Sequence, residues 1–136
     1  MTRSWSIIAI TCLFPAAAHS ADPDRGEREF MKCKSCHAIV TPDGQDLVKG
    51  GKTGPNLFGV IGREVGSLRD YRYGTGLAII GATGVIWDEA SVAAFLIDPA
   101  AWVKTAANDP SARTKMTFKT PKGGKDIVAY LRRIVP

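Results

Sequence analysis

The sequence predicts an all-α domain built from short helices. Apolar residues recur at helical spacing in 88–97 and in 124–135, and the second stretch carries Lys and Arg on its opposite face. A third helix is predicted from Pro23 to about Cys33, because the Asp-Pro-Asp triplet that opens it favours a first helical turn. Strand signals are few throughout, so helices should supply most of the regular structure.

Proline and glycine divide the rest of the chain. Pro99 ends the helix before it and is suited to the first turn of another short helix that carries Trp102. The segment 38–53 is polar, contains Asp-Gly and Gly-Gly turn signals, and is predicted to be a loop. The segment 53–63 contains too much Gly and Pro for a regular element, and 108–111 is predicted to be a turn.

The first 20 residues have the pattern of a secretory signal peptide. Arg3 precedes the apolar run 7–14, and small residues precede a cleavage site that we expect after Ser20. The apolar run is too short to span a bilayer. With 136 residues in total, 45% of them hydrophobic, the remaining 21–136 is expected to form one exported domain that is not embedded in a membrane.

The motif Cys33-Lys34-Ser35-Cys36-His37 is the strongest functional signal. Two thiols at this spacing can each form a thioether with haem, while the adjacent imidazole binds the iron. A thioredoxin-like dithiol would need a βαβ surrounding that the pattern lacks. A structural zinc site needs four Cys or His ligands, and 21–136 contains only three such residues. A plain disulfide would leave His37 unexplained. The motif therefore predicts one covalently bound haem c.

The ligands of the iron follow from a short set of candidates. His37 is the only histidine in 21–136, which excludes ligation by two histidines. Met31 lies two residues before Cys33, on the side of the haem that His37 occupies, whereas Met116 lies in a non-periodic segment that is free to close over the other side. We expect His37 and Met116 as ligands, with the Pro55 carbonyl accepting a hydrogen bond from His37. Such ligation leaves no open position on the iron and suits an electron carrier.

Polar-tipped aromatic residues are a second group of candidates. Their hydrogen-bond donors are able to reach the haem propionates, or their rings simply form part of an ordinary core; these residues are Tyr71, Tyr73 and Trp87. Arg63 has a similar pair of interpretations, as a partner of the haem or as a solvated surface cation.

The formal net charge of the whole chain is +5, and residues 21–136, which lack only Arg3 of the 18 Lys and Arg, keep +4, which favours acidic partners. Nucleic acid is the rival partner of a basic chain, but the predicted export and the lack of a long run of Lys and Arg argue against it. Several lysines flank the segments expected to frame the haem edge and are predicted either to steer docking or to be ordinary solvated lysines: Lys32, Lys34, Lys49, Lys52, Lys115 and Lys119.

These motifs, in this order, resemble class I cytochrome c, and their spacing is similar to that of bacterial cytochrome c2. The resemblance covers essentially all of 21–136 and rests on the haem-attachment motif, the segment 53–63, Tyr73, Trp87, the triplet 114–116 and the triplet 129–131. It implies the class I cytochrome c fold, about five short helices wrapped around one haem bound through Cys33 and Cys36.

The resemblance also implies roles for further residues. Contacts to the propionates are expected from Arg63, Tyr73, Trp87 and Thr114. Gly26 and Phe30 are expected to pack against Tyr130 where the terminal helices cross. Phe95 departs from the pattern, because related proteins usually carry there a tyrosine whose hydroxyl faces the methionine sulfur.

The implied function is one-electron transfer in the periplasm, without enzymatic activity. The implied donor is a membrane cytochrome bc complex, and the acceptor is a terminal oxidase of a respiratory chain or a photosynthetic reaction centre, each meeting a monomer at its lysine-rich haem edge. Two alternatives stay open. A haem enzyme would need an open iron site, and a donor module dedicated to one enzyme would have a surface fitted to that enzyme alone.

Overall fold

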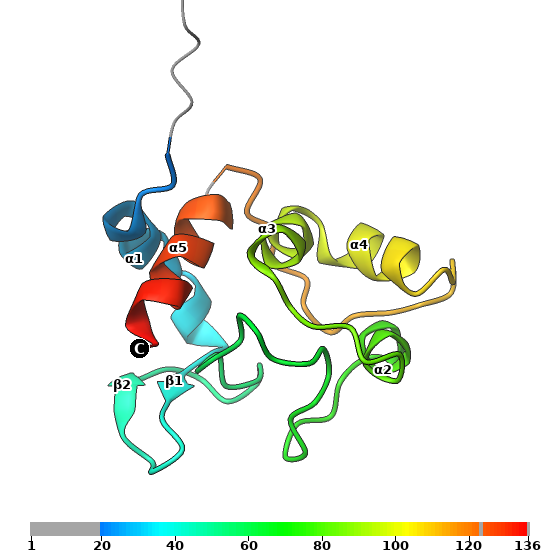
Figure 1. The fold of residues 1–136 in the computed structure, drawn as a ribbon, viewed down its shortest axis with the longest axis horizontal. Coiled ribbons are helices and arrows are strands. Elements are labelled where there is room, and N and C mark those ends of the chain that lie inside the picture. Colours follow the sequence, from blue (N-terminus) through cyan, green and yellow to red (C-terminus); the bar gives the residue numbers. More distant parts are fainter. Residues whose placement is uncertain (1–19, 123, 136) are drawn as a thin grey trace, which may run out of the picture.

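The two ends of the described chain meet as a pair of packed helices. The structure is a computed structural model that describes residues 20–122 and 124–135, so all of the predicted signal peptide except Ser20 lies outside the described residues. Helix α1 (Pro23–Phe30) and helix α5 (Gly124–Ile134) pack against each other (Figure 1). Asp22 caps α1 by accepting hydrogen bonds from the backbone of the first turn, as its Asp-Pro-Asp start predicts.

The contact between α1 and α5 depends on a glycine and two aromatic rings. A Cβ atom at Gly26 would lie 1.9 Å from the carbonyl oxygen of Asp126, so only glycine allows this approach. The rings of Phe30 and Tyr130 lie 5.4 Å apart at their centroids. Phe30 thus packs on Tyr130 as predicted, whereas the neighbours of Gly26 are the backbone atoms of Asp126 and Ile127.

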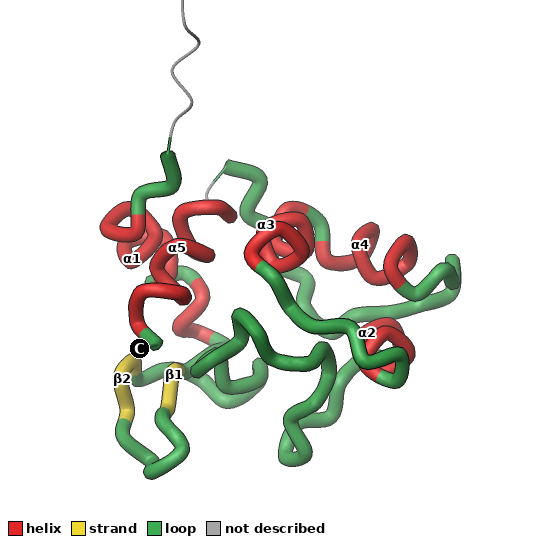
Figure 2. Tube along the Cα trace, in the orientation of Figure 1, coloured by secondary structure: helices red, strands yellow, loops and turns green. Residues whose placement is uncertain are grey.

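The other three α-helices form the opposite half of the molecule (Figure 2). Helix α3 (Glu89–Ile97) packs against α5 and against α4 (Pro99–Ala106), which in turn contacts α2 (Thr75–Gly81). Asp88 and Ser91 form a capping box at the start of α3, and Asp98 caps α4. These caps confirm two predicted helices, the one at 88–97 and the one that begins at Pro99. None of the helices in the described residues is long and apolar enough to cross a membrane.

Three sequence predictions differ from the structure. Helix α1 ends at Phe30 and not near Cys33, because the next N–H groups bond three residues back and lead into a 3-10 helix, η1 (Cys33–Ser35). The predicted loop 38–53 contains an antiparallel pair of short strands, β1 (Ile39–Val40) and β2 (Asp46–Val48). Helix α2 lies in a stretch that the apolar pattern left unassigned, because its Gly76 and Gly81 weaken the helical signal.

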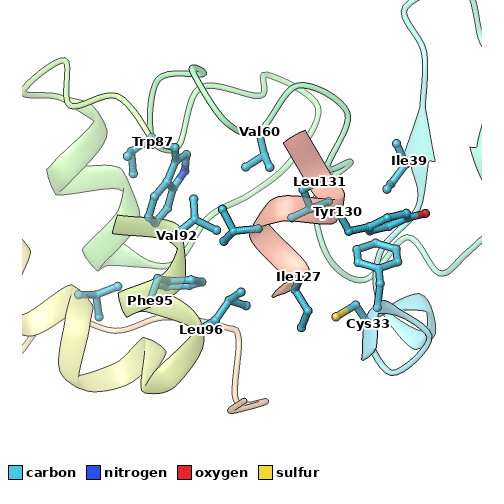
Figure 3. Close-up of a cluster of buried hydrophobic side chains, with 14 of the residues drawn as sticks. Cys33, Ile39, Val60, Trp87, Val92, Phe95, Leu96, Ile127, Tyr130 and Leu131 are labelled. Carbon is cyan, nitrogen blue, oxygen red and sulfur yellow. The ribbon is translucent and has the colours of Figure 1, made fainter. Parts of the chain in front are cut away.

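Buried apolar side chains from both halves meet in the middle of the molecule (Figure 3). Val92 and Leu96 of α3 face Ile127 and Leu131 of α5, and Val60 joins them from the irregular segment before α2. The same side chains line a cavity, so the core is also the wall of the site.

Candidate functional site

A cavity with mainly apolar walls lies among α1, α3, α5 and the irregular segments. It encloses about 820 Å³ of atom-free space, part of it open to solvent. A second cavity adjoins it and shares Cys33, His37, Pro55 and Met116 with it. All of the residues predicted to bind the cofactor line the first cavity except Cys36, which lines the second. Sequence reasoning missed the apolar wall, whose residues carry only an ordinary core pattern: Leu57, Val60, Leu77, Val92, Leu96, Ile127 and Leu131.

The two motif cysteines lie at different depths. The chain turns tightly here, with the backbone N–H groups of Cys36 and His37 both donating to the Cys33 carbonyl at 3.1 and 2.9 Å. Cys33 is buried, and its burial raises the pKa of its thiol to about 11. Cys36 is exposed, and hydrogen bonds with Thr53 and Ser35 hold the pKa of its thiol below the usual value. Cys33 lines both cavities, whereas Cys36 lines the second one.

The His37 imidazole is buried and oriented by one hydrogen bond. Its Nδ1 lies 2.7 Å from the carbonyl oxygen of Pro55, which confirms the predicted contact. Burial lowers the pKa of His37, and the bond to Pro55 opposes this shift only in part. A carbonyl oxygen can only accept, so Nδ1 carries the proton and Nε2 keeps its lone pair. This is the form of imidazole that binds a metal.

Three glycines allow the segment 50–54 to lie directly on the motif. A Cβ atom at Gly50 would lie 1.9 Å from the His37 carbonyl oxygen, and one at Gly51 would lie 2.2 Å from the Ser35 carbonyl oxygen. At Gly54 a Cβ atom would lie 2.4 Å from Cε1 of the His37 ring. The turn signals of this segment were visible in the sequence, but their role as the support of His37 was not.

Met116 borders both cavities and is partly buried. Its N–H donates to the Thr114 hydroxyl at 3.2 Å. The other described methionine, Met31, is 59% exposed and lines neither cavity. The structure therefore places one thioether at the site, in the segment that the sequence singled out.

Arg63 brings a positive charge to the cavity wall. Its guanidinium donates to the carbonyl oxygens of Phe58 and Asn56, each at 3.0 Å, and burial lowers its pKa. No carboxylate pairs with it among the described residues. A partly buried cation bonded only to carbonyl oxygens is suited to an anionic group in the cavity. Tyr73, whose pKa is raised by burial, lines the same wall.

Trp87 belongs to the core and also borders the cavity. Its ring stacks on Trp102 with centroids 4.9 Å apart and meets Phe95 edge-on at 5.3 Å, as part of the core. It also lines the cavity. Tyr71 is held by a 3.0 Å hydrogen bond from its hydroxyl to the Thr53 carbonyl and packs edge-on against Tyr73.

The residues present fit a covalently attached haem. The cavity is mainly apolar, as a flat macrocycle requires. Two thiols, an imidazole and a thioether border this cavity and the one that adjoins it, and these are the groups that attach and ligate c-type haem. Arg63 and Tyr73 add polar partners for carboxylates on one wall.

Comparisons with known proteins agree with this geometry. No protein-family model matches the chain. Cytochrome c2 of Rhodobacter capsulatus is 46% identical over 120 residues, which cover 88% of each chain. Cytochrome c-550 of Paracoccus denitrificans is 44% identical over 133 residues, covering 96% of this chain and 86% of the relative.

Solved structures show the same relationship. The structure of cytochrome c2 from Rhodobacter capsulatus matches with a TM-score of 0.82 at 46% identity, covering 84% of this chain and 98% of that one. The cytochrome c2 structure from Paracoccus denitrificans matches with a TM-score of 0.82 at 44% identity, covering 85% and 97%. The chain therefore belongs to the class I cytochromes c of the bacterial cytochrome c2 type, which are electron-transfer proteins and not enzymes, and it carries haem c covalently at Cys33 and Cys36.

Proposed function

We propose that this cytochrome transfers single electrons in the periplasm through a haem ligated by His37 and Met116. The observation that carries the proposal is the pairing of the His37 imidazole, held with Nε2 free by the Pro55 carbonyl, with the thioether of Met116 around one cavity. The bound haem supplies the redox change of the iron. The chain holds the imidazole in one tautomer, excludes water with apolar walls, and offers Arg63, Tyr73, Trp87 and Thr114 toward the propionates.

His/Met ligation suits this role because it closes both axial positions of the iron and raises the reduction potential. A change of oxidation state then needs no bond to be made or broken. The cavity walls have the matching property, since buried aliphatic and aromatic side chains keep the dielectric around the site low.

The ligation is tested by the absorption spectrum of the purified holoprotein in both oxidation states, with a Met116→Leu variant and a Met31→Leu control. We expect a low-spin spectrum that carries the sulfur-to-iron band in the ferric form and is unaffected by added cyanide on the time scale of mixing. The band should be lost in Met116→Leu and kept in Met31→Leu. A high-spin parent spectrum, or immediate cyanide binding, would instead indicate an open iron site and a haem enzyme.

The proposed partners are a membrane cytochrome bc complex as donor and a terminal oxidase or photosynthetic reaction centre as acceptor. The support is the row of lysines predicted to frame the haem edge, of which Lys32 and Lys115 line the cavity beside Cys36. Phe118 lines the same cavity, is 42% exposed, and adds an apolar contact at its rim. Basic groups around an apolar patch suit rapid, transient docking of a monomer onto acidic surfaces.

Export to the periplasm is part of the proposal and rests on the signal-peptide pattern of residues 1–20. The intact mass of the exported protein tests it. We expect the mass of residues 21–136 plus one haem. The mass of the full chain plus haem would show that the segment is retained.

A further inference from the structure

The segment that carries Met116 is anchored to the start of α2. After α4 the chain runs back past α2 (Figure 1). There the N–H of Arg113 donates to the Thr75 hydroxyl at 3.0 Å, and the N–H of Gly76 donates to the Arg113 carbonyl at 2.9 Å. Arg113 thus makes both of its backbone hydrogen bonds with the first turn of α2, three residues before Met116.

Close packing reinforces this anchor. A Cβ atom at Gly74 would lie 2.6 Å from the Arg113 carbonyl oxygen and 3.1 Å from Cα of Thr114, so the two backbones are in direct contact. One residue before Met116, the Lys115 ammonium group donates to the Arg72 carbonyl. The whole segment 113–115 is therefore held by 72–76.

The far side of the Met116 segment has a separate anchor. The N–H of Thr120 donates to the carbonyl of Leu96, at the end of α3, at 2.8 Å. Between the two anchors, the backbone hydrogen bond recorded for Met116 is the local one to Thr114. The position of the thioether is therefore set by where the two ends are fixed.

We infer that Thr75 is a positioning residue for Met116, whose hydroxyl keeps the methionine segment closed over the haem. The inference rests on the proposed ligation by Met116 and extends it to α2, a helix that carries no ligand. Thr75 is the residue through which this can be tested, because its contribution is a single side-chain hydrogen bond on an exposed site. The hydrogen bonds of Gly76 with Arg113 and of Thr120 with Leu96 join backbone groups that a substitution does not remove.

The expected effect follows from a two-state equilibrium between a closed segment and an open one. An external ligand binds the iron only when Met116 has left, so its apparent affinity is its intrinsic affinity multiplied by the open fraction. A hydrogen bond of ordinary net strength shifts such an equilibrium by about two- to tenfold. Thr75→Val keeps the shape of the side chain and removes the acceptor, so it should raise the apparent affinity by this factor.

The experiment titrates the ferric holoprotein with imidazole at fixed pH and follows the sulfur-to-iron band. For Thr75→Val we expect an apparent dissociation constant about two- to tenfold lower than that of the parent, with a similar midpoint of global unfolding in denaturant. Thr75→Ser retains the hydroxyl and should bind imidazole like the parent. Thr83→Val removes another threonine hydrogen bond beside α2, to the Ile80 carbonyl, and should also behave like the parent.

Gly74→Ala provides a second, steric test. Its added methyl group would press on the Arg113 carbonyl and should likewise increase imidazole binding. If Thr75→Val and Gly74→Ala both bind imidazole like the parent while the parent shows the sulfur-to-iron band, the positioning role is overturned and Met116 ligation stands. If the parent itself lacks the band, Met116 ligation is overturned, and the inference falls with it.

Discussion

At the scale of single residues, the support beneath His37 is the most demanding contact of the site. Gly54→Ala would place a methyl group 2.4 Å from Cε1 and 2.7 Å from Nδ1 of the imidazole. The ring would have to move, which weakens its hydrogen bond to Pro55 and its alignment with the iron. We expect a loss of about 1–3 kcal/mol in the free energy of unfolding and an increased high-spin fraction in the ferric spectrum.

Gly44→Ala is the matched control for this change. No heavy atom lies within 4 Å of a Cβ atom at Gly44, but its φ of +88° disfavours alanine. This variant should therefore lose some stability and keep a normal spectrum. A spectrum of Gly54→Ala that is also unchanged would contradict the proposed role of Gly54.

Phe95 provides a second prediction at this scale. Its ring lines the same cavity as Met116 and packs edge-on against Trp87 and Trp102. The proposed haem site therefore contains a ring without a hydroxyl group at the position where related proteins usually have a tyrosine. In Phe95→Tyr, the hydroxyl would donate a hydrogen bond to the Met116 sulfur, and this bond would weaken the electron donation from the sulfur to the ferric iron. We expect a reduction potential higher by about 20–60 mV, the equivalent of one ordinary hydrogen bond.

Redox titration of the parent and Phe95→Tyr measures this shift. Phe58→Tyr adds the same hydroxyl to a partly buried ring that lines neither cavity, and its potential should equal that of the parent. Equal potentials for all three proteins would show that the missing hydroxyl does not tune the haem.

At the scale of elements, an ion pair fastens α1 to α5. Asp126 is buried, accepts a hydrogen bond from the Asp22 N–H at 2.8 Å, and pairs with Arg25. The bond with Arg25 holds the pKa of Asp126 below its usual value. Because that pKa is lowered in the folded state, the pair stabilises the fold above about pH 4 and loses its effect as the pH falls through the lowered value.

Arg25→Ala should therefore unfold more easily than the parent at pH 7, and the difference should shrink below about pH 4. Denaturant unfolding of both proteins from pH 7 to pH 3 measures it. Arg28→Ala removes a positive charge from the same helix that makes no ion pair among the described residues, and should show little change at any pH. A difference for Arg25→Ala that stays constant with pH would exclude titration of the pair as its cause.

The same scale shows which parts of the fold the sequence could predict. Helices α3 and α4 were predictable because their capping residues and apolar positions agree, and α5 was predictable from its apolar spacing. Helix α2 was not located, since its stability comes from packing on α4 and on Arg113, which local sequence does not reveal. The strands β1 and β2 were missed for a similar reason: Ile39 is fully buried by tertiary contacts within an otherwise polar stretch.

The candidate site was predictable where chemistry restricts the residue type. Cysteine, histidine and methionine are few, so Cys33, His37 and Met116 could be chosen by elimination. The glycines beneath His37 and the aliphatic wall could not, because their role depends on distances between segments far apart in the chain.

At the scale of the whole molecule, charge should govern how fast electrons reach the haem. The net charge acts on any charged reactant, whereas the lysines that we propose to lie at the haem edge act at shorter range. Some of these lysines have local partners: Lys32 pairs with Glu29, and Lys119 pairs with Asp98. Lys34 and Lys52 form no ion pair among the described residues, so their charge is available to a partner.

Oxidation of the ferrous protein by small complexes of opposite charge isolates this local effect. With anionic ferricyanide, we expect the rate to fall as ionic strength rises, and with a cationic cobalt(III) complex we expect it to rise. Lys34→Glu should slow the reaction with ferricyanide several-fold at low ionic strength and converge on the parent rate in about 1 M salt. Lys104→Glu changes the net charge equally, but Lys104 lies on α4, which lines neither cavity, whereas Lys34 lies between Cys33 and Cys36, so the effect of Lys104→Glu should be smaller. Equal effects of the two substitutions would mean that only net charge matters, and the proposed docking edge would lose its support.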